Sequence, residues 1–198
     1  ADTFATWNAG ELKSFLIEIT ADILRTPDPQ NPGALLIHAI LDKAGQKGTG
    51  KWTIVAAAEH GVAIPTIAAA VDARILSAAK DLRVLAEATL RPPRGELQGV
   101  GIKDLRDALY AAKIASYTQG FALLQAASRA YDYGTDLGEI ARIWTGGCII
   151  RARFLGHIKA AFDKEPGLKN LLLAPYFRKA IDDAQGAWRR VIAASAEY

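Results

Sequence analysis

The sequence contains no methionine, and this absence bears on what kind of chain it is. A chain read from a start codon begins with methionine, whereas this one begins with Ala1, so we expect a processed or internal piece of a longer protein. Cysteine is almost absent as well. The single Cys148 forms no internal disulfide, which suits the reducing cytoplasm. Because it lies in an apolar run, we interpret it as an inert core thiol.

Long apolar runs and blocks of one charge are also missing. Lysine or arginine interrupts every apolar stretch before the roughly 20 residues that a membrane helix needs, and no secretory signal pattern opens the chain. The net charge is only +3, and acidic and basic residues alternate along the sequence. We therefore predict neither a membrane nor a nucleic-acid partner, since a nucleic-acid binder needs a contiguous basic face.

Helical spacing of apolar residues runs through most of the chain, and no segment shows the alternation of a strand flanked by hairpin turns. Asn8 and Glu11 have the spacing of a capping box, which predicts a helix start. The buried face of that helix is expected to carry Leu12, Phe15, Leu16, Ile19 and Ile23. Later helices are predicted from Pro65 past Leu85, from Ile102 to about Tyr131, and from Tyr176 to Tyr198. Leu82 and Leu85 are expected on the core side of the first, and Leu105 and Leu109 on one side of the second. Helix ends are predicted at His60-Gly61 and Gly134, and a second capping box at Asp136 and Glu139. The fold class is therefore all-α, a single helical domain over residues 1–198.

A short sequence motif occurs twice in the chain. Trp7-Asn8-Ala9-Gly10 and Trp144-Thr145-Gly146-Gly147 share the form W-x-x-G, and an apolar helix is predicted after each. Four-residue patterns recur freely, so duplication and coincidence are both open at this point.

The segment from Ala44 to Thr53, AGQKGTGKWT, concentrates the features of an anion site. Three glycines within six residues free the backbone to turn sharply and to approach a ligand. Lys47 adds positive charge, Thr49 adds a hydroxyl, and the helix predicted next adds free N–H groups. It is not a Walker A loop, because the G-x-x-x-x-G-K-[ST] spacing fails at Trp52. A phosphate or carboxylate cradle and a flexible turn with solvated lysines are both open.

Arg74 lies on the helix predicted from Pro65 and can look back toward this loop. A guanidinium that bonds a phosphate through two N–H groups is the natural third partner of such a site. The other interpretation is a surface arginine paired with Asp72 or with solvent.

Motifs for other chemistry are absent. His38, His60 and His157 lie too far apart for a metal site, so no metal is expected. Gly99-Val100-Gly101 lacks the third glycine and the preceding strand of a dinucleotide fingerprint.

A series of short segments, spread over nearly the whole chain, carries a family resemblance. The segments are WN at 7–8, EL at 11–12, SFLIEIT at 14–20, DKAGQKGTGKWT at 42–53, AR at 73–74, LS at 76–77, AKI at 112–114, SY at 116–117, QGF at 119–121, IW at 143–144 and GGCIIR at 146–151. Together, and in this order, they resemble 6-phosphogluconate dehydrogenase, and the stretch around Lys47 is too long for a chance match. Two positions depart from the family: Thr118 replaces a small residue and Thr145 a basic one, which leaves their local contacts open.

The resemblance implies an activity and a larger molecule. The family oxidises and decarboxylates 6-phosphogluconate to ribulose 5-phosphate with NADP, in the cytoplasmic pentose phosphate pathway. This chain resembles only the helical domain, made partly by duplication, so we expect a Rossmann NADP-binding domain before residue 1. A C-terminal tail that reaches the other subunit of a homodimer is expected after residue 198. The family's catalytic lysine and glutamate would also precede residue 1. We therefore expect no catalytic or cofactor-binding residue here, and no activity from this chain alone.

The resemblance also implies a role for the loop from Gly45 to Gly50. Lys47 and Thr49 match the family's substrate-phosphate loop, and Arg74 matches the helix arginine that binds the same phosphate. The implied role is a substrate-binding and dimerisation domain. An alternative from a different class is a stand-alone helical interaction module that kept the scaffold and lost the chemistry. An intact mass or the parent reading frame distinguishes the two.

Overall fold

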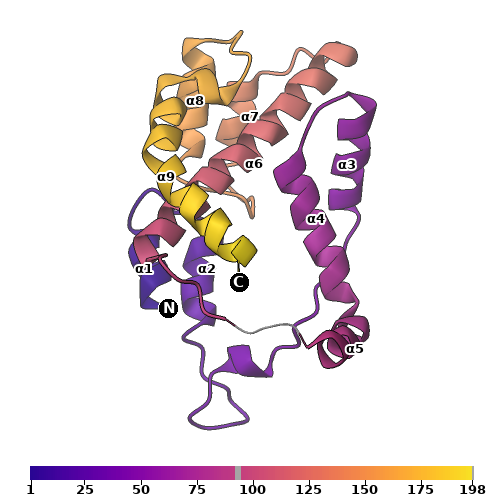
Figure 1. Ribbon diagram of the computed structural model, residues 1–198. Helices are drawn as coiled ribbons and strands as arrows, with labels where there is room; N and C mark the ends of the chain where they lie inside the picture. Colours follow the sequence, from indigo (N-terminus) through magenta and orange to yellow (C-terminus); the bar gives the residue numbers. More distant parts are fainter. Residues whose placement is uncertain (92–94, 198) are drawn as a thin grey trace. The chain divides into compact units, whose positions relative to one another are not determined.

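The computed structural model describes residues 1–91 and 95–197, and within these ranges the regular structure is helical (Figure 1). Extended pairing there is limited to two isolated bridges, Ser14 with Ala152 and Pro27 with Leu35. The all-α prediction is confirmed. In chain order the helices are α1 (Asp2–Asn8), α2 (Phe15–Ile23), η1 (Leu36–Ala39), α3 (Thr49–Glu59), α4 (Pro65–Ala78), α5 (Lys80–Leu90), α6 (Ile102–Ala130), α7 (Leu137–Ile143), α8 (Leu155–Lys164), η2 (Leu171–Leu173) and α9 (Pro175–Glu197).

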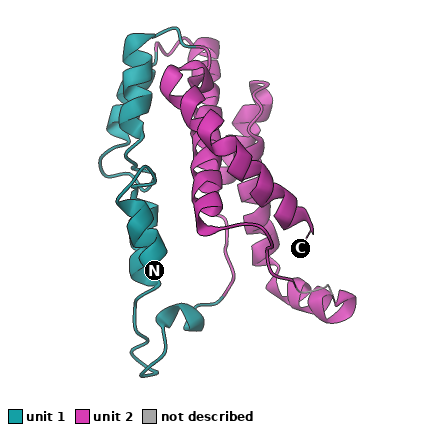
Figure 2. Ribbon diagram, turned by 60° about the vertical axis from the view of Figure 1, so that its left-hand side comes forward, with its two compact units in different colours: residues 1–41, 135–168 teal, residues 42–134, 169–198 magenta. Residues whose placement is uncertain are grey.

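The chain divides into two compact units, shown in different colours in Figure 2. Unit 1 contains residues 1–41 and 135–168, and unit 2 contains residues 42–134 and 169–198. Within the described ranges, no helix is both long and apolar enough to cross a membrane.

Unit 1 contains two helix–turn–helix segments, α1–α2 and α7–α8. Trp7 lies in the last turn of α1, and Trp144 is the residue that follows α7. The two W-x-x-G copies therefore occupy equivalent places, at the turn between the helices of each segment. The stretches before α2 and α8 pair in antiparallel fashion, with the Arg153 amide donating to the Lys13 carbonyl at 2.9 Å.

The start of the first predicted helix needs correction. Asn8 ends α1 instead of capping a helix, and its side-chain oxygen accepts from the Ser14 amide at 3.0 Å. Ser14 is the N-cap of α2. Because α2 begins after an extra turn, the buried face differs from the predicted one: Ile17 is buried, whereas Leu16 is exposed.

Unit 2 is built on α6, a helix of 29 residues that packs against α9. The Ala111 side chain of α6 is completely buried, and Ala184 and Ala187 of α9 are buried too. Small side chains let two helix backbones approach closely, so these alanines favour a tight contact. The hydroxyls of Tyr110 and Tyr176 lie 2.7 Å apart across the same pair of helices.

The extents of α6 and α9 agree with prediction to within one residue at each described end. The predicted face of α6 was wrong. Leu105 and Leu109 are exposed, while Ile114 and Phe121 are buried. Alanine dominates several faces of this helix, so its apolar spacing did not single out the buried one.

The long helix predicted from Pro65 is two helices. Pro65 starts α4 as expected, but Ala79, with φ −84° and ψ 50°, separates α4 from α5. Leu82 and Leu85, predicted as core, are exposed. At this break the Arg83 side chain donates to the Ser77 carbonyl at 3.2 Å.

Candidate functional site

The loop from Gly45 to Gly50 leads directly into the N-terminus of α3. Gly48 is the N-cap, and its φ of 97° lies in the left-handed region that favours glycine. Its carbonyl accepts from the Trp52 amide at 3.0 Å, which closes the first helical turn. The three amides between these residues have no intrahelical acceptor, and the helix dipole makes this end positive.

Gly50 sets how closely α3 packs on α4. A Cβ atom at this position would lie 2.7 Å from Cγ2 of Val71, which is buried on α4. Glycine is therefore required here by close helix contact. The same contact fixes the start of α3 against the helix that carries Arg74.

Arg74 bonds to the loop, as its position on the predicted helix implied. Its Nε donates to the Gly45 carbonyl oxygen at 3.1 Å, and Nη2 donates to the same oxygen. A guanidinium carries five N–H donors, so this contact uses only part of the set. Pairing with Asp72, the other interpretation, is not the arrangement of the described structure.

Lys47 and Thr49 lie on the exposed surface of the same short loop, Thr49 as the first residue of α3. The structure thus places all three sequence-predicted site residues on one loop and the helix bonded to it. Ammonium, hydroxyl, guanidinium and free helix amides are the donors that a phosphate dianion prefers.

Four residues that hold this loop were not singled out as site residues from the sequence. The Ser77 hydroxyl accepts from the Ala44 amide at 3.0 Å. Asp42 forms ion pairs with Lys80, through Oδ1, and with Arg83 at 3.3 Å, through Oδ2. Hydrogen bonds from Lys80 and then Arg83 are the main causes that lower the pKa of the Asp42 carboxyl. The sequence signal that could have identified them is a pair of cations, Lys80 and Arg83, spaced i, i+3 directly after α4.

Other candidate groups lie apart from this loop. Among the described residues, no cluster of three histidine, cysteine, aspartate or glutamate side chains could hold a metal ion. His60 follows the last residue of α3, as its His-Gly pattern predicted. Cys148 is only partly buried, so its assignment as a core thiol was wrong. The apolar run that contains it forms a turn after α7, with Ile149 exposed.

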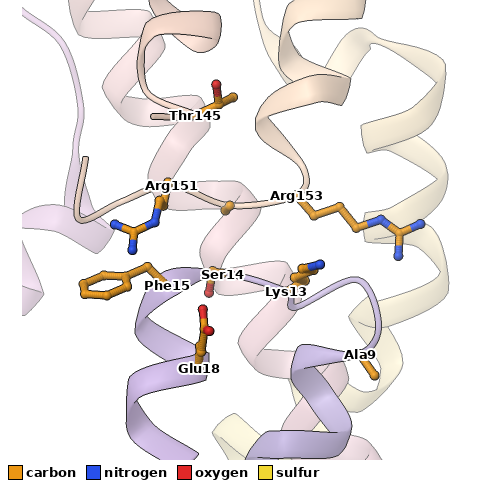
Figure 3. A pocket seen from close by; sticks show the side chains of 9 residues that line it. Ala9, Lys13, Ser14, Phe15, Glu18, Thr145, Arg151 and Arg153 are labelled. Carbon is orange, nitrogen blue, oxygen red and sulfur yellow. The ribbon is translucent and has the colours of Figure 1, made fainter. Parts of the chain in front are cut away.

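Unit 1 contains a pocket of about 490 Å³ beside the paired stretches before α2 and α8. Its walls carry Lys13, Arg151 and Arg153, together with the carboxylate of Glu18 (Figure 3). Arg151 stacks on Phe15, with Cζ 3.8 Å from the ring centroid. The two arginines extend in opposite directions in Figure 3.

The two arginines already have internal partners. Arg153 lies 3.7 Å from Glu11, and Arg151 donates to the Cys148 carbonyl at 3.1 Å. Thr145, at the pocket wall, donates its hydroxyl to the Arg142 carbonyl at 2.6 Å. The arginines of this pocket are therefore already engaged within unit 1.

Comparison with known proteins decides the family. The family model described as "6-phosphogluconate dehydrogenase, C-terminal domain" matches residues 1–198. The chain belongs to this family. The matched residues include both compact units.

Relatives within the family cover nearly the whole chain. The decarboxylating 6-phosphogluconate dehydrogenase of Synechococcus elongatus is 58% identical, over 99% of this chain and 43% of that protein. The rat enzyme is 50% identical, over 97% of this chain and 40% of that protein. This chain therefore spans about two fifths of the length of these relatives.

A solved structure agrees with the fold. The 6-phosphogluconate dehydrogenase of Plasmodium falciparum matches with a TM-score of 0.94 and 42% identity, over 100% of this chain and 43% of that one. That protein is described in its apo form, with its cofactor NADP+ and with its substrate 6-phosphogluconate.

Proposed function

We propose that this chain is the substrate-binding and dimerisation domain of a decarboxylating 6-phosphogluconate dehydrogenase. The complete enzyme would oxidise and decarboxylate 6-phosphogluconate to ribulose 5-phosphate with NADP, in the pentose phosphate pathway. The proposal is supported by family membership and by the substrate complex of the Plasmodium relative. The observation that carries the site is the Arg74 side chain bonded to the glycine loop that contains Lys47 and Thr49.

In this proposal the chain's own residues bind and orient the substrate. Lys47 and Arg74 neutralise the phosphate dianion, while Thr49 and the first amides of α3 donate to its oxygens. Fixing the phosphate end places the distant reacting carbons, because remote binding energy is used for orientation. Catalytic acid–base groups would come from outside this chain.

NADP, when bound to the complete enzyme, accepts the hydride. The described residues do not fit a dinucleotide: Gly99 and Gly101 precede α6 without a strand before them, and the third glycine of the fingerprint is absent. We therefore assign the coenzyme to a domain outside this chain and place no step of its chemistry here.

Two further features belong to the proposal. We assign the enzyme to a homodimer, which is supported by exposed apolar side chains on α4 and α5, among them Leu76, Leu82 and Leu85. We also assign it to the cytoplasm, which a single cysteine suits. Relatives from rice and Arabidopsis named as chloroplastic show that the family also occurs in plastids.

The test uses the complete dehydrogenase with Lys47→Ala or Arg74→Ala. Each change should weaken 6-phosphogluconate binding by about tenfold or more, since a charge-assisted hydrogen bond contributes on the order of 1.5–3 kcal/mol. NADP binding should change by less than about twofold, because neither residue faces the coenzyme in this proposal. Lys169→Ala, which removes an exposed lysine elsewhere, is the control. Equal losses of affinity for both ligands would refute the site.

The alternative, a stand-alone interaction module without chemistry, is not favoured. This chain is 58% identical to an enzyme of the family. Lys47, Thr49 and Arg74 also lie on one loop and the helix bonded to it, which supports a phosphate site. A parent reading frame without a nucleotide domain would support the alternative.

A further inference from the structure

The loop that carries Lys47 is fixed to the α4–α5 junction at three successive points. Both the carboxylate and the carbonyl of Asp42 are bound there, the latter by Arg83 Nη2 at 2.7 Å. The Ala44 amide donates to Ser77, and the Gly45 carbonyl accepts from Arg74. The backbone just before the phosphate-binding residues is therefore held by side chains of α4 and α5.

Asp42 is the residue on which two of these helix side chains converge. Lys80 bonds Oδ1, and Arg83 contacts Oδ2 at 3.3 Å while also bonding the Asp42 carbonyl. Arg83 additionally donates to the Ser77 carbonyl at 3.2 Å, next to the break between α4 and α5. We call Asp42, Lys80 and Arg83 the Asp42 clamp. Lys80 and Arg83 both lie just after the break at Ala79.

The clamp has a consequence for Arg74. Arg74 lies one turn before Ser77 on α4, so the residues that anchor the loop and the residue proposed to bind the phosphate share one helix end. An error of about 1 Å in the placement of a binding group is enough to lose much of its contribution. Holding Asp42 against α5 therefore sets the position of Lys47 and Thr49 relative to Arg74.

We propose that Asp42 is a positioning residue for phosphate recognition, acting through Lys80 and Arg83 to hold the Gly45–Gly50 loop in register with Arg74. This inference rests on the proposed function and deepens it. It gives the Asp42 carboxylate an indirect part in substrate affinity, since a negative carboxylate repels the phosphate and does not bind it directly. It also gives a role to the helix break that the sequence pattern did not predict.

The test is steady-state kinetics of the complete dehydrogenase with Asp42→Asn. Asparagine keeps the size and removes the charge, and Arg83 can still bond the residue-42 carbonyl, so the fold should persist. We expect the KM for 6-phosphogluconate to rise about fivefold or more, with kcat and the KM for NADP within about twofold, since only uniform substrate binding is lost. Inhibition by inorganic phosphate should weaken by the same factor.

Matched variants separate positioning from general structure. Asp81→Asn removes the same charge from the first turn of α5 and should leave all constants unchanged. Asp42→Glu keeps the charge and should recover most of the affinity for 6-phosphogluconate. In an Arg83→Gln background, Asp42→Asn should add less than its effect alone, because both changes disrupt one clamp.

The outcomes distinguish the two proposals. If Lys47→Ala weakens substrate binding and Asp42→Asn does not, the clamp inference is wrong and the proposed function stands. If Lys47→Ala has no effect, the proposed function fails. If Asp42→Asn raises both KM values together, or lowers kcat and the melting temperature with them, Asp42 is structural and the inference is overturned.

Discussion

Lys113 lies on α6 beside Ile114, which is buried, and burial lowers the pKa of its ammonium group to about 8. In an unfolded chain the pKa of this group would stay near its ordinary value of 10.5. Between these two values the unfolded state binds more protons than the folded state. Stability should therefore rise with pH across this window, because the cost of burying the charged form is fully present below about pH 8 and is lost progressively as the pH approaches 10.5.

The prediction is checked by urea denaturation of the wild type and of Lys113→Met between pH 7 and pH 10. The difference in free energy of unfolding between the two proteins should move in favour of the wild type as the pH rises, because methionine cannot titrate. Lys103→Met, which changes an exposed lysine on the same helix, controls for effects of helix charge. A difference that stays flat across the range would show that Lys113 is not titrating as its burial implies.

At this scale the sequence predicts residues whose chemistry is conspicuous. Lys47, Thr49 and Arg74 stand out because cation, hydroxyl and glycine patterns point to anions. Asp42 does not stand out, because its role depends on Lys80 and Arg83 meeting it in three dimensions. Thr118 shows the same limit: it is buried on α6, and among the described residues its hydroxyl has no hydrogen-bond partner, which spacing alone did not foretell.

Among elements, the contact between α3 and α4 gives a sharp test. Gly50→Ala would place a methyl group 2.7 Å from Val71 Cγ2, so the helices must separate or Val71 must move. Overpacking of this kind costs about 1–3 kcal/mol. Denaturation midpoints should show this loss, whereas Gly45→Ala, with no atom within 4 Å of the added carbon, should change stability by less than about 1 kcal/mol.

Val71→Ala supplies the internal control for this contact. It removes the methyl group that the new alanine would meet, so Gly50→Ala should cost less in that background than in the wild type. Additive effects would mean that the close approach of Gly50 to Val71 is not what requires glycine. In the complete enzyme, Gly50→Ala should also raise the KM for 6-phosphogluconate, because α3 carries Thr49.

Helices with strong local signals were predicted and boundaries set by tertiary contacts were not. Pro65 marks a helix start that follows from a backbone restriction, and the structure has it, whereas α6 ends at Ala130, before Gly134. The N-cap at Asp136 was also predicted, and its side chain accepts from the Glu139 amide at 3.0 Å. The Glu139 carboxylate, which a capping box would direct to the Asp136 amide, instead accepts from Arg142 Nε at 2.6 Å.

For the whole molecule, the distribution of apolar side chains bears on assembly. Unit 2 exposes a series of large apolar residues along α4 and α5, with exposed fractions of 65% at Leu82 and 62% at Leu85. Apolar side chains gathered on one surface are typical of a protein–protein interface. The apolar spacing predicted both leucines in an internal core, whereas the structure places them on the surface. We expect that surface to be covered by a second copy of the protein.

Sedimentation velocity tests this expectation. The wild-type chain should sediment as a dimer at micromolar concentration, and Leu82→Glu with Leu85→Glu should shift it to a monomer, because burying two unpaired carboxylates opposes association. The control introduces the same charge at two exposed loop positions, with Gln30→Glu and Asn31→Asp, and should remain a dimer. If the Leu82/Leu85 double variant also remains a dimer, the interface lies elsewhere. If the wild type is a monomer, these residues do not drive self-association of this chain, and the dimerisation role would require parts of the protein outside it.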